Sequence, residues 1–524
     1  MLIIKEKLNN FFKEKELAVG CCAALLGSMM VAYFSIGRKY FTFSTEVDYI
    51  ARHLMDAQRL LNGEPLLLHF HPPFYSIILA PFQIIFQDWF TTGLVVSWIS
   101  STIVMVTSFI FFYHLGGRYA AWGSLLGLMS SSVFLTYSSF ATSDVFFLAL
   151  YSSCFLLTIL AIQKKSITLW GLAGVILGCA LLTRSNALTL IILLAFPWFQ
   201  SIDFKCRLKA FTCIFVMCLI VLGTWWVAAT LTGSPFWAKF GPVNLATRYF
   251  PTGGGDPFTF EARQQAISRF TSYKDVLLYD PKFMIVTFVK DFFQNLKLIF
   301  LSERLLPFPL GLFALPGIFI FFFKKKNIFT ILFLIATISQ FILLCFHEYE
   351  ARYYIFLIPV LGAVIGFCLH NILESISIGW NKKAALIFFL PFLLSGMKEI
   401  RYSFAETYSI LHAQDKEFGE IIPMAKKLVD PKGVIVSRGQ LIPFYIGVPN
   451  VDLPDIRNLE DFRVWIENTP SRGPVYIYFG SDEKIWRPKL NELLLAKRAP
   501  DWIEPIAQSR SPNMWVLYRF KRVH

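Results

Sequence analysis

The stretch LAVGCCAALLGSMMVAYFSI, residues 17–36, contains no charged side chain and decides the class of this protein. A helix needs roughly 20 mainly apolar residues to cross the hydrocarbon core of a bilayer. The stretch follows a charged start with Lys5, Lys7, Lys13 and Lys15. It is too long for the apolar region of a signal peptide and lacks a clean small-residue cleavage site. We therefore predict a membrane-spanning helix.

Similar apolar blocks continue through the first three quarters of the chain. Of its 524 residues, 55% are hydrophobic and 16% are charged, whereas soluble domains carry roughly 25% charged residues. The blocks predict a polytopic α-helical membrane protein with eleven spans, at about 17–36, 92–113, 120–138, 145–162, 168–183, 187–200, 210–231, 305–323, 328–346, 353–371 and 384–398.

Two further apolar segments are ambiguous: 74–86 is short and flanked by prolines, and 281–301 contains several charges. If the N-terminus is cytoplasmic and neither segment spans, every later basic cluster also faces the cytoplasm, as the positive-inside rule requires. Both segments are therefore predicted to lie at the outer interface as helices. The formal net charge of +14 is interpreted as this topology signal and not as a nucleic-acid site.

This topology places four hydrophilic parts outside, at about 37–91, 142–144, 232–304 and 399–524. The expected domains are a transmembrane module, 1–398, and a small C-terminal α/β domain, 399–524. In that domain we predict strands at 433–437, 475–479 and 514–520 and helices at 416–429, 459–468 and 488–498.

Ionisable side chains are nearly absent from the middle of the spans. Transporters place such groups at mid-membrane, where ions and substrates pass. The unusual residues gather at the outer edge instead. This distribution favours chemistry at an interface, on a substrate whose tail stays in the lipid.

The outer stretch FSTEVDYIARHL, residues 43–54, places Glu46 and Asp48 beside two basic side chains. It opens a predicted surface helix, 45–61, and a carboxylate there can accept a proton from an incoming hydroxyl or amine. Outer loops of membrane proteins also carry acids without any catalytic role. His71 follows in HFHPPFY, where two prolines fix the entry to the next helix.

The order of several motifs resembles the C-type glycosyltransferases (GT-C), in the branch of bacterial protein O-mannosyltransferases and lipid A aminoarabinose transferases. After the acids come GEPLLLHFHPPFYSIILAPF, TSDVFF, GVILGCALLTRSNALTL and ARYYIFLIPVLGA. The resemblance implies an inverting transfer from a polyprenyl-phosphate sugar to a lipid, glycan or protein acceptor. It also implies the bacterial inner membrane, with the C-terminal domain in the periplasm.

The resemblance assigns roles to individual residues. Asp48 or Glu46 becomes the general base, with Asp48 preferred, and Asp144 matches a second acid that opens a span. Each of two residues also has a structural interpretation. Asp144 fits equally well as an N-terminal helix cap, and Arg184 as an arginine that extends to the membrane interface. The residues expected near the donor phosphate are Tyr49, His71, Arg184, Lys239, Arg248, Arg352 and Tyr353.

No cofactor is expected. The nine cysteines lie in or beside apolar blocks and show no metal-ligand spacing. Glu46, Asp48 and Asp144 offer oxygen ligands for a divalent cation, which remains an open alternative. Four tryptophans of the C-terminal domain can stack on sugar rings, although core packing is the commoner role of such residues. The rival functions are a transporter or flippase of lipid-linked sugars and a membrane scaffold.

Overall fold

The computed structural model describes residues 2–36, 38, 46, 49–68, 71–199, 203–238, 241–250, 266, 268–301, 305–306, 310–325, 328–346, 350–379, 382–413, 415–437, 441–453, 459–471, 473–480, 490, 492–493, 495–510 and 515–521. Contacts divide the chain into two compact units. The helical unit comprises Met1–Gly37, Arg52–Leu245 and Tyr273–Leu411, and the second unit comprises Arg38–Ala51, Ala246–Ser272 and His412–His524.

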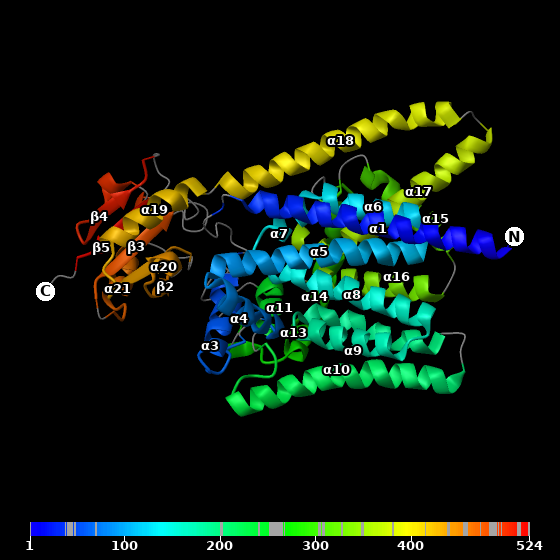
Figure 1. The fold of residues 1–524 in the computed structure, drawn as a ribbon. Coiled ribbons are helices and arrows are strands. Elements are labelled where there is room, and N and C mark those ends of the chain that lie inside the picture. Colours follow the sequence, from blue (N-terminus) through cyan, green and yellow to red (C-terminus); the bar gives the residue numbers. More distant parts are fainter. Residues whose placement is uncertain are drawn as a thin grey trace. The chain divides into compact units, whose positions relative to one another are not determined.

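Long helices lie side by side in the helical unit (Figure 1). Its main elements are α1 (Leu2–Ser35), α3 (Met55–Leu61), α4 (Phe74–Phe86), α5 (Trp89–Gly116), α6 (Arg118–Ser130), α7 (Ser132–Ser138), α8 (Ser143–Lys164), α9 (Ile167–Leu181), the 3₁₀ helix η2 (Ser185–Phe199), α10 (Phe204–Thr232), α13 (Tyr273–Tyr279), α14 (Pro281–Leu301), η4 (Leu310–Phe313), α15 (Ala314–Lys324), α16 (Ile328–Cys345), the 3₁₀ helix η5 (Ala351–Tyr354), α17 (Leu357–Gly379) and α18 (Lys382–Ala413). Three elements contain residues of both units: the π-helical turn η1 (Tyr49–Leu54), α11 (Gly241–Tyr249) and α18, whose last two residues belong to the second unit.

This architecture confirms the predicted polytopic α-helical class. Among the described residues, six helices are long and apolar enough to cross a membrane, and four more are apolar but shorter. The predicted span 120–138 is interrupted at Ser131, whose backbone is extended and whose hydroxyl accepts the N–H of Phe134 at 3.3 Å to start α7. The predicted last span, 384–398, lies within the longer α18, which passes the expected domain boundary.

Helix α14 confirms the expected helix at 281–301, but its charged and polar residues do not all lie on one exposed side. Lys290, Gln294 and Lys297 are exposed, whereas Asp291 is buried together with Asn295. The buried side packs on α16 through aromatic contacts such as Phe292 with Phe341, with ring centroids 5.5 Å apart. Packing against a neighbouring helix therefore overrides the surface pattern seen in the sequence.

Glycines bring α6 and α17 into backbone contact. A Cβ atom added to Gly123 would lie 2.3 Å from the carbonyl oxygen of Gly362, and one added to Gly362 would lie 2.4 Å from that of Gly123. Gly127 and Gly366 extend the same contact by one turn in each helix. Small residues spaced four apart permit this approach in apolar surroundings, where packing and not water drives helix association.

The second unit holds the expected small α/β domain. Its sheet has the order β2-β1-β3-β5-β4, with β2, β1 and β3 parallel and β3, β5 and β4 antiparallel. The strands are β1 (Val434–Ser437), β2 (Asn450–Asp452), β3 (Val475–Gly480), β4 (Ile503–Gln508) and β5 (Trp515–Phe520), and the helices are α19 (Asp415–Leu428), α20 (Leu441–Ile446) and α21 (Leu459–Glu467).

Successive residues of β1 pack into different cores, as the two-residue period of a strand requires. Val434 and Val436 join the core that contains Phe462 of α21, and Ile435 joins the core that contains Ile422 of α19. All four residues of β1 are buried, which fits a central parallel strand covered on both faces.

Three predicted strands and two predicted helices of this domain are present. The predicted helix 488–498 is not: its described residues include 3₁₀ turns, among them η7 (Ala496–Arg498), and none of them is α-helical. Strands β2 and β4 and helix α20 were not predicted.

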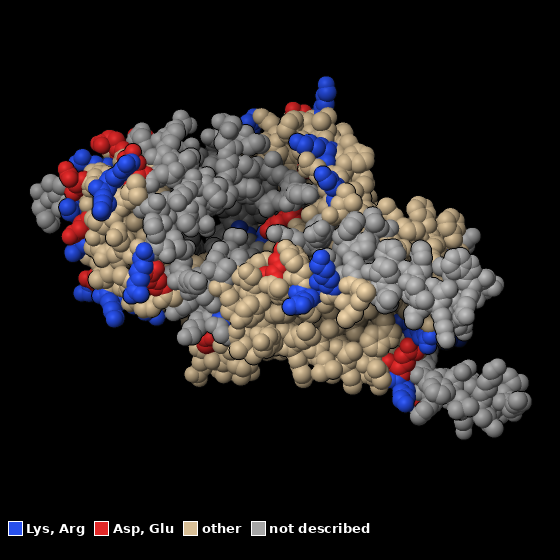
Figure 2. All heavy atoms as spheres, turned by 90° about the horizontal axis from the view of Figure 1, so that it is seen from above, with Lys and Arg blue, Asp and Glu red and all other residues tan. Residues whose placement is uncertain are grey.

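Of the four tryptophans proposed as sugar platforms, Trp515 is buried in the core that contains Ile435, and Trp465 and Trp502 pack partly buried against the other core, which contains Phe462. Trp486 lies outside the described residues. Core packing therefore accounts for the described tryptophans. Charges of both signs are interspersed on this domain in Figure 2, whereas broad surfaces of the helical unit show neither.

Candidate functional site

The beginning of α8 holds Asp144 in a fixed orientation. Thr142 is the N-cap, and its hydroxyl accepts the backbone N–H of Asp144 at 3.3 Å while donating to Asp144 Oδ2 at 2.7 Å. A negative charge in the first turn is favoured by the helix dipole. Asp144 Oδ1 accepts a hydrogen bond from Arg184, so both carboxylate oxygens are engaged. In this arrangement Asp144 can orient the guanidinium group of Arg184.

Arg184 stands in the turn between α9 and η2. Its backbone N–H donates to the carbonyl of Ala180 at 3.1 Å, which closes the end of α9. The side chains of Arg184 and Asp144 are 15% and 10% exposed. A charge pair with so little exposure is weakly screened, and loss of either partner would leave an uncompensated charge. Arg184 also lies near the ring of Tyr353, 5.9 Å from its centroid.

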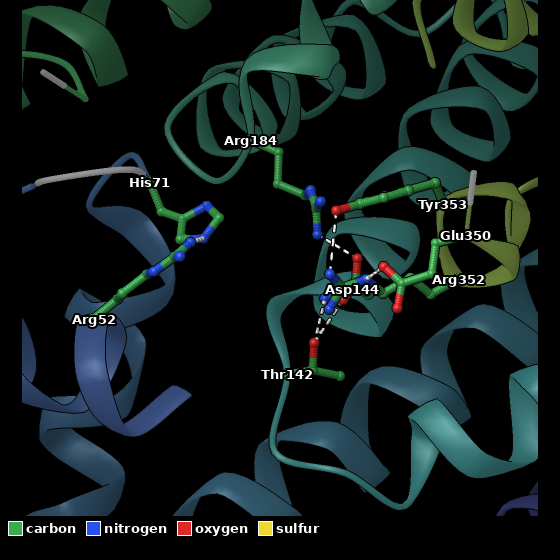
Figure 3. A network of polar contacts seen from close by, with 8 residues as sticks. All are labelled: Arg52, His71, Thr142, Asp144, Arg184, Glu350, Arg352 and Tyr353. Carbon is green, nitrogen blue, oxygen red and sulfur yellow. Dashed lines mark hydrogen bonds and ion pairs between the residues drawn. The ribbon is translucent and has the colours of Figure 1, made fainter. Parts of the chain in front are cut away.

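A second arginine reaches the same place from η5. Arg352 forms an ion pair with Glu350 at 2.6 Å, donates from Nη2 to the Tyr353 hydroxyl at 3.2 Å, and lies 5.0 Å from that ring's centroid. Figure 3 shows Arg184 converging on Asp144 from one segment, and Arg352 and Tyr353 from another, η5. Residues more than 200 positions apart in the sequence thus form one network.

Arg52 and His71 form a second group, drawn on the opposite side of Figure 3. Arg52 Nη1 lies 3.0 Å from His71 Nε2. A guanidinium can only donate, so His71 Nε2 accepts and the ring is neutral. The buried His53 stacks on His71 with centroids 4.8 Å apart and meets Tyr75 edge-on at 4.9 Å.

Electrostatics link the two groups. Burial lowers the pKa of His71 well below its ordinary value, and the charges of His53, Arg52, Arg184 and Arg352 lower the pKa further. Three guanidinium groups therefore act on one imidazole. The carboxylates of Asp144 and Glu350 oppose these positive charges. With the histidines neutral, the formal charges of the three guanidinium groups and the two carboxylates sum to +1. Guanidinium groups in such a cluster are suited to bidentate contacts with phosphate.

The buried histidine predicts a pH-dependent stability. Burial lowers the pKa of His53 to about 3, with Arg52 and Arg184 adding to the effect. The unfolded chain, with a pKa of about 6.5, then binds more protons, so stability is complete above that pH and is lost as the pH falls toward 3. The loss is about 1.4 kcal/mol per pH unit within that window. Thermal unfolding in detergent at pH 7 and pH 5 measures it.

His53→Phe is the matched variant for this prediction, because it keeps an aromatic ring in the stack and removes the titration. We expect a smaller decrease in melting temperature between pH 7 and pH 5 than in the parent protein. Equal decreases in the two proteins would contradict the assignment to His53.

The structure brings together five of the residues predicted from the sequence. Asp144, Arg184, Arg352 and Tyr353 form one network, and His71 stands beside Arg52. Glu46 lies in the second unit, where its fully buried carboxylate pairs with Arg38 at 2.7 Å.

The remaining predicted residues are less completely described. Tyr49 is 1% exposed and belongs to the second unit. Arg248 lies in α11, and only its backbone is described. Asp48 and Lys239 lie outside the described residues. The predicted surface helix 45–61 is described in part, as η1 followed by α3.

Four members of the site were not assigned a role from the sequence: Arg52, His53, Thr142 and Glu350. Thr142 carried a usable signal, because a threonine before an acid that opens an apolar run is a helix-cap pattern. Glu350 and Arg352 are two apart in sequence, a spacing that places side chains on different sides of an α-helix. In the structure Glu350 is the N-cap of the 3₁₀ helix η5, which contains Arg352.

The described residues contain no group of three or more His, Cys, Asp or Glu side chains placed to hold a metal ion. Two of the three acids considered for a cation have arginine partners, Glu46 with Arg38 and Asp144 with Arg184. These pairings use carboxylate oxygens that a cation would need.

Comparisons with known proteins agree with this architecture. Residues 70–227 match the family model described as dolichyl-phosphate-mannose-protein mannosyltransferase. No curated protein sequence matches the chain.

Two solved structures of glycosyltransferases are similar to the chain. ArnT from Cupriavidus metallidurans bound to undecaprenyl phosphate is 14% identical, with a TM-score of 0.51 over 97% of this chain and 98% of that one. The oligosaccharyltransferase of Archaeoglobus fulgidus in its apo form is 13% identical, with a TM-score of 0.55 over 88% of this chain and 70% of that one. Both likenesses confirm the fold class expected from the sequence.

Proposed function

We propose that this chain, which has the fold of the GT-C superfamily of glycosyltransferases, is an inverting transferase. It moves a sugar from a polyprenyl-phosphate donor to a hydroxyl or amine of a lipid, glycan or protein acceptor. The proposed location is the bacterial inner membrane, with the N-terminus cytoplasmic and the reaction at the periplasmic face. The orientation is supported by the basic clusters between the predicted spans.

The cluster of Arg52, Arg184 and Arg352 is the observation that carries this proposal. A lipid phosphate must be held while its tail stays in the membrane, and the cluster belongs to the unit with the apolar helices. Asp144 and Glu350 pair with two of these arginines and keep them oriented. The likeness to a structure that contains undecaprenyl phosphate supports this class of donor.

The reaction then proceeds as one displacement. Asp48 accepts the proton of the acceptor hydroxyl or amine, whose oxygen or nitrogen attacks the anomeric carbon from the face opposite the phosphate. The bond from that carbon to the phosphate oxygen breaks, and polyprenyl phosphate leaves with the electron pair. The arginine cluster stabilises the charge that develops on this leaving group. Asp48 is preferred over Glu46 because Glu46 already pairs with Arg38 in a buried site.

The direct test incubates purified protein with undecaprenyl-phosphate sugars and an acceptor extract. Release of undecaprenyl phosphate, measured by mass spectrometry, is the expected result. The alternative, a flippase for lipid-linked sugars, would move the intact lipid between leaflets and release none. Protease accessibility of residues 44–56 from the cytoplasmic side would contradict the proposed orientation.

Arg352→Gln tests the phosphate role. A hydrogen bond to a charged group contributes about 1.5–3 kcal/mol, so kcat/KM for the donor should fall about 10- to 100-fold. Glu350, which loses its partner, is 37% exposed and keeps contact with water, so the protein should remain folded. The exposed Arg463, paired with Glu467 on α21, provides the control variant Arg463→Gln. Equal activity of the two variants would remove Arg352 from the site.

A further inference from the structure

Two buried amides lie close to the arginine cluster in the helical unit. Asn186 follows Arg184 by two residues and is 8% exposed, and Gln340 of α16 is fully buried. Among the described residues, Asn186 Oδ1 and Gln340 Nε2 have no hydrogen-bond partner. Buried polar groups in native proteins are nearly always hydrogen-bonded, so each exception requires an explanation.

Gln340 cannot satisfy both ends of its amide with the partner it has. Its Oε1 accepts a hydrogen bond from the hydroxyl of Thr189. The oxygen of that hydroxyl also lies 3.0 Å from the backbone carbonyl oxygen of Asn186. Turning the amide around would let Nε2 donate to the Thr189 oxygen instead, and Oε1 would then be left over. In either orientation one end of the Gln340 amide has no hydrogen-bond partner among the described residues.

Two separate routes connect these amides with the arginine cluster. Along η2, Asn186 and Thr189 follow directly after Arg184. On α16, Phe341 next to Gln340 contacts Tyr354, with ring centroids 5.8 Å apart, and Tyr354 is adjacent to Tyr353. The amides therefore lie within the helical unit, close to the groups that would hold the phosphate.

The chemistry of the two amides selects a ligand. A phosphate only accepts hydrogen bonds, so it cannot satisfy Asn186 Oδ1, and an acyl chain forms none. A sugar hydroxyl both donates and accepts, and it can satisfy an amide in either orientation. Neutral amides also avoid placing another charge beside the cluster.

We propose that Asn186 and Gln340 bind hydroxyl groups of the donor sugar and contribute to sugar specificity. This inference rests on the proposed function, because it assumes a sugar attached to the phosphate held by the arginines. Thr189 acts as a positioning residue, since it holds the Gln340 side chain.

The test compares the binding of two probes, undecaprenyl phosphate and undecaprenyl phosphate that bears one sugar. The sugar is mannose or glucose, whichever gives the lipid that the parent protein binds more tightly. Gln340→Met and Asn186→Leu keep the side-chain volume and remove the amide. We expect Kd for the sugar-bearing lipid to rise roughly 5- to 30-fold and Kd for undecaprenyl phosphate to change less than about twofold. Melting temperatures should stay near that of the parent protein.

Ser124→Ala provides the control, because the Ser124 hydroxyl is likewise buried and without a partner among the described residues but lies on α6. It should leave both Kd values unchanged. The inference is overturned if the parent binds the two lipids equally, or if the amide variants weaken both lipids alike or neither. A parent that prefers the sugar-bearing lipid but never releases undecaprenyl phosphate would instead refute the proposed transferase.

Discussion

Replacing Asp48 by Asn should reduce kcat for sugar transfer about 10²- to 10⁴-fold, the range that a positioned general base contributes. The loss corresponds to about 2.7–5.5 kcal/mol in activation free energy. Binding of undecaprenyl phosphate should persist, because the arginine cluster is unchanged. The measurement is the rate of undecaprenyl phosphate release at saturating donor, together with donor Kd.

Glu46→Gln is the informative comparison for Asp48→Asn. Removing one partner of a buried ion pair costs about 3–5 kcal/mol, so this variant should lose stability through the unpaired Arg38. The fraction that remains folded should retain transfer activity. If folded Glu46→Gln is inactive while Asp48→Asn is active, the two acids have exchanged roles. Activity in the double variant would refute a carboxylate base in this stretch.

Gly362→Leu should abolish most of the folded protein. Its Cβ would lie 2.4 Å from the carbonyl oxygen of Gly123, and the obstacle is backbone, which cannot rotate away as a side chain can. Overpacking typically costs about 1–3 kcal/mol, and separating α6 from α17 should exceed that range. The measurements are yield of monodisperse protein in detergent and its melting temperature.

Gly223→Leu on α10 is the matched control, because a Cβ added there meets nothing within 4 Å. This substitution also replaces a poor helix former by a good one, so it should not lower the melting temperature. Similar melting temperatures for the two leucine variants would show that the glycine contact between α6 and α17 is dispensable.

Much of the fold could be predicted from local sequence. Apolar length identified the spanning helices, because a helix in lipid must satisfy its backbone internally and cover itself with apolar side chains. Short apolar runs rich in Val, Ile and aromatic residues identified β1, β3 and β5. The three-residue β2 and the proline-containing β4 carry too weak a pattern, and their partners in the sheet define them.

The candidate site was only partly predictable. The resemblance to the C-type glycosyltransferases singled out Asp144, Arg184 and Arg352 individually. Nothing in their spacing indicated that Asp144 would pair with Arg184, or that Glu350 would orient Arg352. Arg52 and His53 were visible as basic side chains but had no assigned partner.

The sequence by itself determined that this is a polytopic helical membrane protein with a small α/β domain, because the length of apolar blocks and short runs of strand-forming residues are local properties of the chain. Only the tertiary structure decided which charges share a partner and which buried amides lack one. Those relations depend on distances between segments far apart in the sequence, and helix packing alone sets these distances.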